Sequence, residues 1–98
     1  MNTHLPLRAL ADDVCVAPQL TPAAMAEGAR AGFRAVVNNR PDFEEGATQP
    51  TNTQIEAAAH AAGLVYRFLP VSGAYQSPED AAAMARLLAE LPRPLLMF

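Results

Sequence analysis

The polar side chains that could do chemistry in this 98-residue chain are concentrated in one short segment. The segment follows the apolar residues 35–37 and contains Asn39, Arg40, Asp42, Glu44 and Glu45. An amide, a guanidinium and several carboxylates in one turn can bind a polar ligand. The segment therefore predicts a binding site, whose chemistry depends on what the fold places beside it.

A buried strand must lead into this segment. Residues 35–37 form a short apolar run with two β-branched valines and no polar alternation, which is typical of a strand covered on both faces. Pro41 has no N–H to donate to a ladder, so the strand must end near Asn39 or Arg40. In open parallel α/β sheets, ligands bind beyond the carboxyl ends of the strands, which is where the polar segment falls.

Other reactive side chains are isolated. Cys15 is the only cysteine, so an internal disulfide is excluded. Within the apolar run 14–17 it is expected to be a small buried hydrophobe, and use as a nucleophile is the alternative. His60 has no Asp or Cys at ligand spacing, so we interpret it as a surface or boundary residue rather than a metal ligand.

Three helices are predicted from their end signals. Thr21-Pro22 begins the first, and Gly32 ends it. Residues 50–53 begin the second, with a capping-box pattern at Thr53 and Glu56, and Gly63 ends it. Ser77-Pro78-Glu79-Asp80 begins the third, which residues 92–94 end. Capping accounts for Glu79 and Asp80, and a catalytic role for either is the alternative.

The remaining apolar runs predict strands at residues 7–10, 14–17, 33–38, 64–69 and 95–98. The first two form a hairpin around the turn 11–13. Alternation of strands and helices then predicts an α/β fold with a mostly parallel sheet, flanking helices, right-handed crossovers and the hairpin at one edge. Residues 38–45, residues 72–76 and whatever follows Phe98 should meet at one rim of this sheet.

Composition narrows the class of protein. The net charge is −3, and the seven basic residues are all Arg and scattered along the chain. Nucleic acid and anionic membrane surfaces are therefore not expected as partners. No apolar run is long enough for a signal peptide or a membrane span, so we expect a cytoplasmic protein. Residues 1–98 should form one domain, and the sequence implies no metal or cofactor.

The carboxyl-terminal run, Leu95-Leu96-Met97-Phe98, is the most apolar strand, and no polar residue follows it. Chain termini normally lie in exposed hydrophilic segments. We therefore expect the domain to be incomplete and the chain to be one piece of a longer protein.

Several motifs together resemble a known family. They are Val14-x-Val16-x-Pro18-Gln19-Leu20-Thr21, then Ala31-Gly32-Phe33-Arg34-x-Val36-Val37-Asn38-Asn39-Arg40-Pro41-Asp42-x-Glu44, then Ala62-Gly63-Leu64-x-Tyr66 and Leu69-Pro70-Val71. This pattern resembles the phosphatase-like domain of the beta-lactamase hydrolase-like protein family. That family is similar to the cysteine-dependent tyrosine and dual-specificity phosphatases.

The resemblance implies a site that this chain holds only in part. Such phosphatases use a Cys-x5-Arg loop directly after the strand that matches residues 95–98, and its thiolate attacks phosphorus. The sequence ends before that loop and before the helices that follow it. Cys15 does not replace it, because Thr21 stands where the Arg would be. The fragment is therefore expected to be catalytically inactive.

The resemblance also suggests supporting residues. The shoulder of the phosphate pocket would be formed by Asn39, Arg40, Asp42, Ser72 and Gly73. Related enzymes often carry a general acid Asp after the strand matching 66–71, but residues 72–76 contain none, so Asp42 is a weak candidate for that role. The alternative for Arg40 and Asp42 is a salt-bridged or turn-capping pair that shapes the rim.

Three functions remain open from the sequence. In the first, the parent protein is a phosphatase that acts on a small anionic substrate or a phosphopeptide. A sulfurtransferase would use the same missing cysteine to carry a persulfide. A non-catalytic interaction module would use the exposed strand or bare apolar surface to form a homo-oligomer.

Overall fold

The computed structural model describes residues 3–44, 46–71 and 77–98. In chain order the elements are β1 (Arg8–Ala11), β2 (Val14–Val16), α1 (Pro22–Arg30), β3 (Ala35–Asn38), α2 (Asn52–Ala61), β4 (Val65–Phe68), α3 (Pro78–Glu90) and β5 (Leu95–Met97). The predicted alternation of strands and helices is confirmed. Four predicted strands, at 14–17, 33–38, 64–69 and 95–98, are one or two residues shorter than expected.

The five strands form one sheet in the order β1-β2-β5-β3-β4. The inner strand β5 pairs in parallel with both β2 and β3, and β4 pairs in parallel with β3. β1 pairs antiparallel with β2 at the edge, so the predicted mostly parallel sheet with an edge hairpin is confirmed. The carboxyl ends of four strands therefore lie on one rim.

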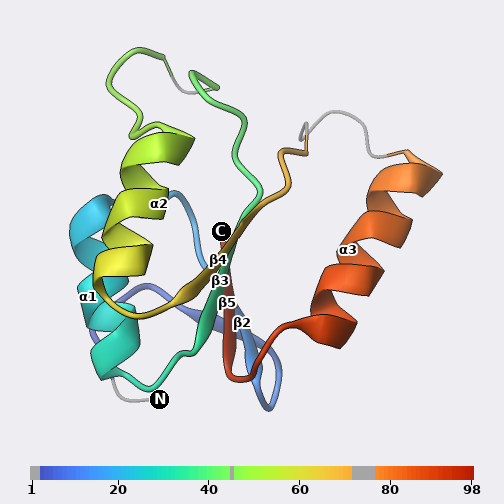
Figure 1. The fold of residues 1–98 in the computed structure, drawn as a ribbon, viewed down its shortest axis with the longest axis horizontal. Coiled ribbons are helices and arrows are strands. Elements are labelled where there is room, and N and C mark those ends of the chain that lie inside the picture. Colours follow the sequence, from blue (N-terminus) through green and yellow to red (C-terminus); the bar gives the residue numbers. More distant parts are fainter. Residues whose placement is uncertain (1–2, 45, 72–76) are drawn as a thin grey trace.

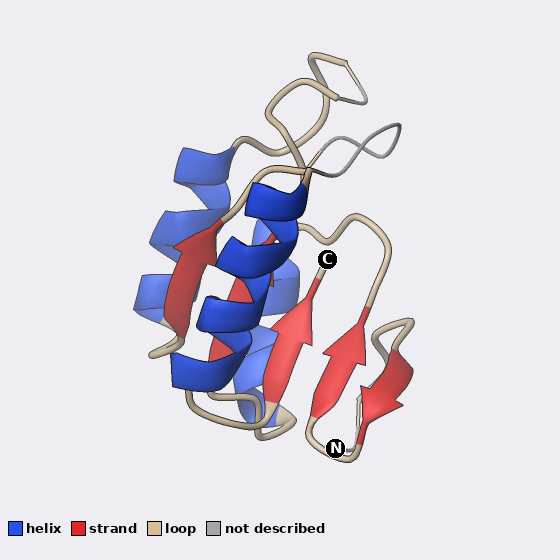
Figure 2. Cartoon of the chain, turned by 90° about the vertical axis from the view of Figure 1, so that its right-hand side faces the viewer, coloured by secondary structure: helices blue, strands red, loops and turns tan. Residues whose placement is uncertain are grey.

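The helices cover opposite faces of this sheet. Figure 1 shows α1 and α2 on one face and α3 on the other, and Figure 2 shows α3 in front of the strands. Right-handed crossovers explain the division, because the chain advances in one direction from β2 to β3 and β4, then turns back to β5. Among the described residues, no helix is long and apolar enough to cross a membrane.

Alternate residues of the inner strands form two cores. Val36 and Leu96 point to the side of α1 and α2, where they pack with Met25, Ile55 and other buried residues. Ala35, Val37 and Leu95 point to the other side, where partly buried residues of α3 pack against them. The side chains of Ala35, Val36, Val37, Leu95 and Leu96 are all 0% exposed. The prediction of a strand buried on both faces is therefore confirmed for β3.

Side-chain caps begin the helices, as predicted for two of the three. Thr21 accepts a hydrogen bond from the Ala24 N–H, and Ser77 forms a capping box with Asp80. The predicted box at Thr53 and Glu56 is wrong, because the box of α2 lies two residues earlier, at Thr51 and Gln54. Both pairs have the spacing of a capping box, so the sequence pattern alone did not separate them.

Glycines at positions 28 and 32 offer a test of the end of α1. Gly32 has φ +104°, a conformation that costs other residues about 1–2 kcal/mol. Gly28 lies inside α1, and a Cβ there would meet Leu96 Cδ2 at an ordinary 3.6 Å. We predict that Gly32→Ala lowers the free energy of unfolding by about 1–2 kcal/mol. Gly28→Ala should raise it by about 0.5–1 kcal/mol.

Urea unfolding of the two variants beside the wild type measures both changes. Both substitutions add one methyl group in or beside α1. Changes of opposite sign in the free energy of unfolding would therefore isolate the effect of the positive φ at Gly32. Equal losses in the two variants would contradict the described end of α1.

Candidate functional site

Asn39 joins the ends of three strands at the rim. Its backbone N–H donates to the carbonyl of Phe98, after β5, at 2.7 Å, and its own carbonyl accepts from the N–H of Val71 at 2.9 Å. Its side-chain Nδ2 donates to the carbonyl of Leu69, after β4, at 2.9 Å. The predicted meeting of strand ends is thus made by hydrogen bonds of one residue.

Asn38, the last residue of β3, brings a polar side chain into the core. It is 2% exposed, and a buried amide needs partners because leaving it unpaired costs about 1–3 kcal/mol. Its Nδ2 donates to the hydroxyl of Tyr66 at 3.1 Å, and that hydroxyl donates to Oδ1 of Asn52 at 2.6 Å. One phenol therefore links β3, β4 and the beginning of α2.

The same network fixes both ends of the polar loop. Asn38 Oδ1 accepts from the backbone N–H of Arg40 at 2.9 Å. The carboxylate of Asp42 accepts from the backbone N–H of Asn52, the first residue of α2, at 2.6 Å. A closed circuit then runs from Arg40 through Asn38, Tyr66 and Asn52 to Asp42, and back along the chain.

Tyr66 stays neutral within this circuit. Burial raises the pKa of its phenol, and the carboxylates of Glu56 and Asp42 add to that shift, while the hydrogen bond from Asn38 opposes it. His60 of α2 lies against the ring edge-on, with 6.5 Å between the ring centres. His60 is exposed, which confirms its interpretation as a surface residue.

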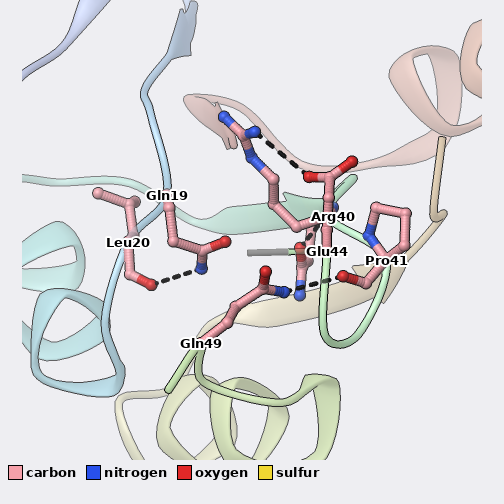
Figure 3. A network of polar contacts seen from close by, with 7 residues as sticks. Gln19, Leu20, Arg40, Pro41, Glu44 and Gln49 are labelled. Atoms are coloured by element: carbon pink, nitrogen blue, oxygen red, sulfur yellow. Dashed lines mark hydrogen bonds and ion pairs between the residues drawn. The ribbon is translucent and has the colours of Figure 1, made fainter. Parts of the chain in front are cut away.

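Arg40 and Gln49 hold the outer part of the loop, as Figure 3 shows. The guanidinium of Arg40 pairs with the carboxylate of Glu44 at 3.5 Å. Gln49 is 6% exposed and donates from Nε2 to the carbonyl of Pro41 at 2.8 Å. The loop is therefore held by two contacts, a hydrogen bond from the buried amide of Gln49 and the partly exposed ion pair between Arg40 and Glu44.

Gln19 follows β2, the strand that lies on the opposite side of β5 from β3. Its Nε2 donates to the carbonyl of Leu20 at 2.9 Å, which sets the orientation of the amide (Figure 3). Its Oε1 is buried and accepts no hydrogen bond from the described residues. A buried acceptor without a hydrogen-bond partner is rare in folded proteins, so a hydrogen-bond donor from another molecule or another part of the protein is expected beside it.

Phe43 is the unusual residue of the loop. Its φ is +64°, and its side chain is 62% exposed. A bulky side chain is disfavoured in this left-handed region, and residues held there gather at functional sites. The loop thus holds an aromatic ring out toward solvent in a conformation that glycine would adopt more easily.

The structure distributes the predicted site residues as follows. It brings Asn39, Arg40 and Asp42 together on one loop, but Arg40 is paired with Glu44 and Asp42 caps α2, so each has its own partner. Ser72, Gly73 and Glu45 lie outside the described residues.

The expectation of a small buried hydrophobe is confirmed for Cys15, which is 4% exposed in β2. Asp80 caps α3, as predicted.

Sequence reasoning missed Tyr66, Asn52 and Gln49. The signal for Tyr66 was a hydroxyl-bearing ring in a predicted strand, because a buried phenol usually has a hydrogen-bond partner. Asn52 and Gln49 gave no comparable signal, since polar residues before a helix are ordinary. Within the described part of the chain, no group of three His, Cys, Asp or Glu side chains could hold a metal ion.

Comparison with known proteins identifies the family. The family model for the beta-lactamase hydrolase-like protein, phosphatase-like domain, matches residues 6–98. The chain belongs to this family. It is 45% identical over 64 residues to a beta-lactamase hydrolase-like protein of Agrobacterium fabrum, a match that covers 65% of this chain. It is 46% identical over 61 residues to one of Xylella fastidiosa, covering 62% of this chain.

Solved structures share the fold. A Neisseria meningitidis protein whose name gives phosphatase as its proposed activity has a TM-score of 0.81 and 28% identity over 91% of this chain. A Shewanella putrefaciens protein with the same proposed activity in its name has a TM-score of 0.77 at 19% identity over 97% of this chain, which shows the fold alone. The resemblance predicted from the motifs is confirmed.

The relatives are longer than this chain. The matched part is 15% of the Agrobacterium protein and 14% of the Xylella protein. It is 63% of the Neisseria chain and 59% of the Shewanella chain. The activity of a whole protein of this family is therefore a matter for proposal.

Removing the Tyr66 hydroxyl tests the circuit. We predict that Tyr66→Phe lowers the free energy of unfolding by about 1–3 kcal/mol, because buried Asn38 and part-buried Asn52 both lose a partner. Thr53→Val is the matched control, since it removes an exposed hydroxyl from α2, the helix that begins with Asn52. It should change the free energy of unfolding by less than about 0.5 kcal/mol. Equal effects in urea unfolding would mean that the circuit contributes nothing.

The ionisation of Tyr66 gives a pH test. Its raised pKa means that the folded chain keeps the phenol neutral where an unfolded tyrosine, of pKa about 10, has ionised. Its contribution to stability is therefore complete below about pH 10 and is lost as pH rises through the folded pKa. In a Tyr75→Phe background, tyrosinate absorbance should titrate above the midpoint of the urea-unfolded chain. Coincident midpoints would refute the shift.

Proposed function

We propose that this chain forms one wall of the phosphate pocket of a cysteine-dependent phosphatase-like hydrolase that acts on phosphate esters. The observation that carries the proposal is the hydrogen bond from the Asn39 N–H to the Phe98 carbonyl, 2.7 Å long, at the carboxyl end of the inner strand β5. Ligands of parallel α/β sheets bind at such ends. Family membership supplies the type of reaction.

A Cys-x5-Arg loop in the longer protein would supply the reactive centre. Its thiolate would attack phosphorus and form an S–P bond, while the ester P–O bond breaks and the alcohol leaves with a proton. Water would then hydrolyse the S–P bond, releasing phosphate and the thiol. Loop amides, the Arg and a helix N-terminus would hold the phosphate oxygens.

The residues of this chain would support that centre. Asn39 ties the ends of β3, β4 and β5 together, and Arg40 and Asp42 would line the shoulder beside it. Ser72 and Gly73 complete the proposed set of shoulder residues. The buried Oε1 of Gln19, after β2, also supports the proposal, because it would accept a hydrogen bond from a backbone N–H of the Cys-x5-Arg loop. Asp42 is the candidate general acid, and its Oδ1 already accepts from Asn52, which leaves Oδ2 to carry a proton.

Residues 1–98 alone should be inactive. A thiolate nucleophile needs an exposed, electropositive site, whereas Cys15 is 4% exposed and paired within the sheet between Ala9 and Leu96. The polypeptide therefore contributes positioning groups to the proposed reaction, and the nucleophile would come from the longer protein.

The decisive test compares residues 1–98 with the protein read through the gene beyond Phe98. We predict that the longer protein hydrolyses p-nitrophenyl phosphate, that its Cys-x5-Arg cysteine changed to Ser abolishes this, and that residues 1–98 do not hydrolyse it. A longer protein without such a loop, or one that instead yields thiocyanate from thiosulfate and cyanide, would overturn the proposal. The second result would indicate a sulfurtransferase.

Asp42 is examined in the same assay. As a general acid, it should contribute about 10²–10⁴-fold to hydrolysis of an alkyl phosphate, whose leaving group needs a proton, and little for p-nitrophenyl phosphate. Asp42→Asn keeps an oxygen for the Asn52 N–H while removing the acid. A variant that hydrolyses both esters normally would limit Asp42 to capping α2.

A further inference from the structure

Gln19 carries the one exception among the buried polar side-chain atoms of the described residues. Its Oε1 is buried and accepts no hydrogen bond there, whereas its Nε2 donates to the carbonyl of Leu20. An unpaired buried acceptor destabilises a fold, and native structures hold few of them. The described part of the chain therefore uses only one end of this amide.

The orientation of the amide decides which kind of group Oε1 can meet. Nε2 lies 2.9 Å from the Leu20 carbonyl, which is an acceptor only. Turning the amide over would place two acceptors against each other, so the oxygen stays on the opposite side. Oε1 would repel an ionised phosphate, and its partner is therefore a donor such as a backbone N–H.

Backbone hydrogen bonds place Gln19 beside the carboxyl end of β5. The Ala17 N–H donates to the Met97 carbonyl at 2.9 Å, and the Asn39 N–H donates to the Phe98 carbonyl at 2.7 Å. A segment that continues from Phe98 therefore leaves the sheet between the chain after β2 and the chain after β3. Figure 3 shows the Gln19 amide directed toward the loop after β3, across this exit.

The backbone of Gln19 is fixed on both sides. Ala17 is held by β5, Leu20 is 4% exposed in the core, and Thr21 caps α1. A side chain on such a backbone, with its amide already bound at one end, loses little freedom when it binds a further group. Gln19 is therefore suited to hold another segment in place.

We propose that Gln19 is a positioning residue that holds the anion-binding loop after β5 in the conformation that binds phosphate. Its Oε1 would accept a hydrogen bond from one backbone N–H of that loop. The remaining loop N–H groups would then be fixed toward the phosphate before it binds, which strengthens binding. The proposal rests on the proposed function for the identity of the loop, and adds how its shape is maintained.

The first test compares Gln19→Met in residues 1–98 and in the longer protein. In residues 1–98 the midpoint of thermal unfolding should stay unchanged or rise, because loss of the bond to Leu20 is offset by removal of the unpaired acceptor. In the longer protein the midpoint should fall by several degrees, because a loop N–H loses its acceptor. Midpoints that change equally in both chains would overturn the proposal.

Gln49→Met is the matched control. It removes another buried amide of the rim, whose Nε2 donates to the Pro41 carbonyl at 2.8 Å within residues 1–98. The midpoint should therefore fall in both chains. This contrast separates an amide that stabilises the described residues from one that acts on the segment after them.

The second test measures the loop directly in the longer protein. Gln19→Met should speed hydrogen exchange of one loop amide by about 10-fold or more, and should raise the Kd for inorganic phosphate about 10-fold. A role confined to the fold of residues 1–98 would move neither value. Unchanged exchange and unchanged phosphate affinity would overturn the proposal.

Hydrolysis by the wild-type longer protein separates the two proposals. If it hydrolyses no phosphate ester, the proposed function fails, and exchange of the loop amides still decides the role of Gln19. If it hydrolyses p-nitrophenyl phosphate and Gln19→Met exchanges, binds phosphate and turns over as the wild type does, the proposed function stands and the role of Gln19 is refuted.

Discussion

The structure depends on how an inner strand ends in polar residues while it is still buried. Asn38 is 2% exposed at the end of β3, where the ladder stops and the loop begins. Its amide satisfies the Tyr66 hydroxyl on one side and the Arg40 N–H on the other. Without these bonds, the buried amide would cost more than a typical hydrogen bond contributes. The loop conformation and the core are therefore coupled through one side chain.

The arrangement of the helices follows from the direction of the crossovers. Two crossovers advance through the sheet and place α1 and α2 on one face, and the third returns and places α3 on the other. The return brings β5 between β2 and β3, so that its carboxyl end reaches the rim beside Asn39. The position of the candidate site is thus a consequence of chain topology, because its polar residues lie where the carboxyl ends of the strands meet.

Much of the fold could be predicted from the sequence, because end signals and buried runs are local. The parallel sheet, the hairpin, the buried Cys15 and the polar loop after β3 all follow from such patterns. The strand order could not be predicted, since nothing local states that β5 lies between β2 and β3. The prediction of the capping box failed for the same reason. Thr51 and Thr53 both fit the local sequence pattern, whereas the Asp42 carboxylate, which accepts a hydrogen bond from the Asn52 N–H, lies ten residues away in the chain. The Tyr66 circuit likewise joins residues from separate elements.

The position of β5 also has a consequence for how the chain folds. β2 and β3 do not pair with each other, so the hairpin and the β3–β4 pair are two half-sheets that only β5 unites. Its pairing joins Val14 to Leu95, near opposite ends of the sequence. Contacts of such long sequence separation pay the entropy of closing a large loop before they gain energy, and they slow folding. Cooperativity across the whole sheet therefore rests on the last strand of the described sequence.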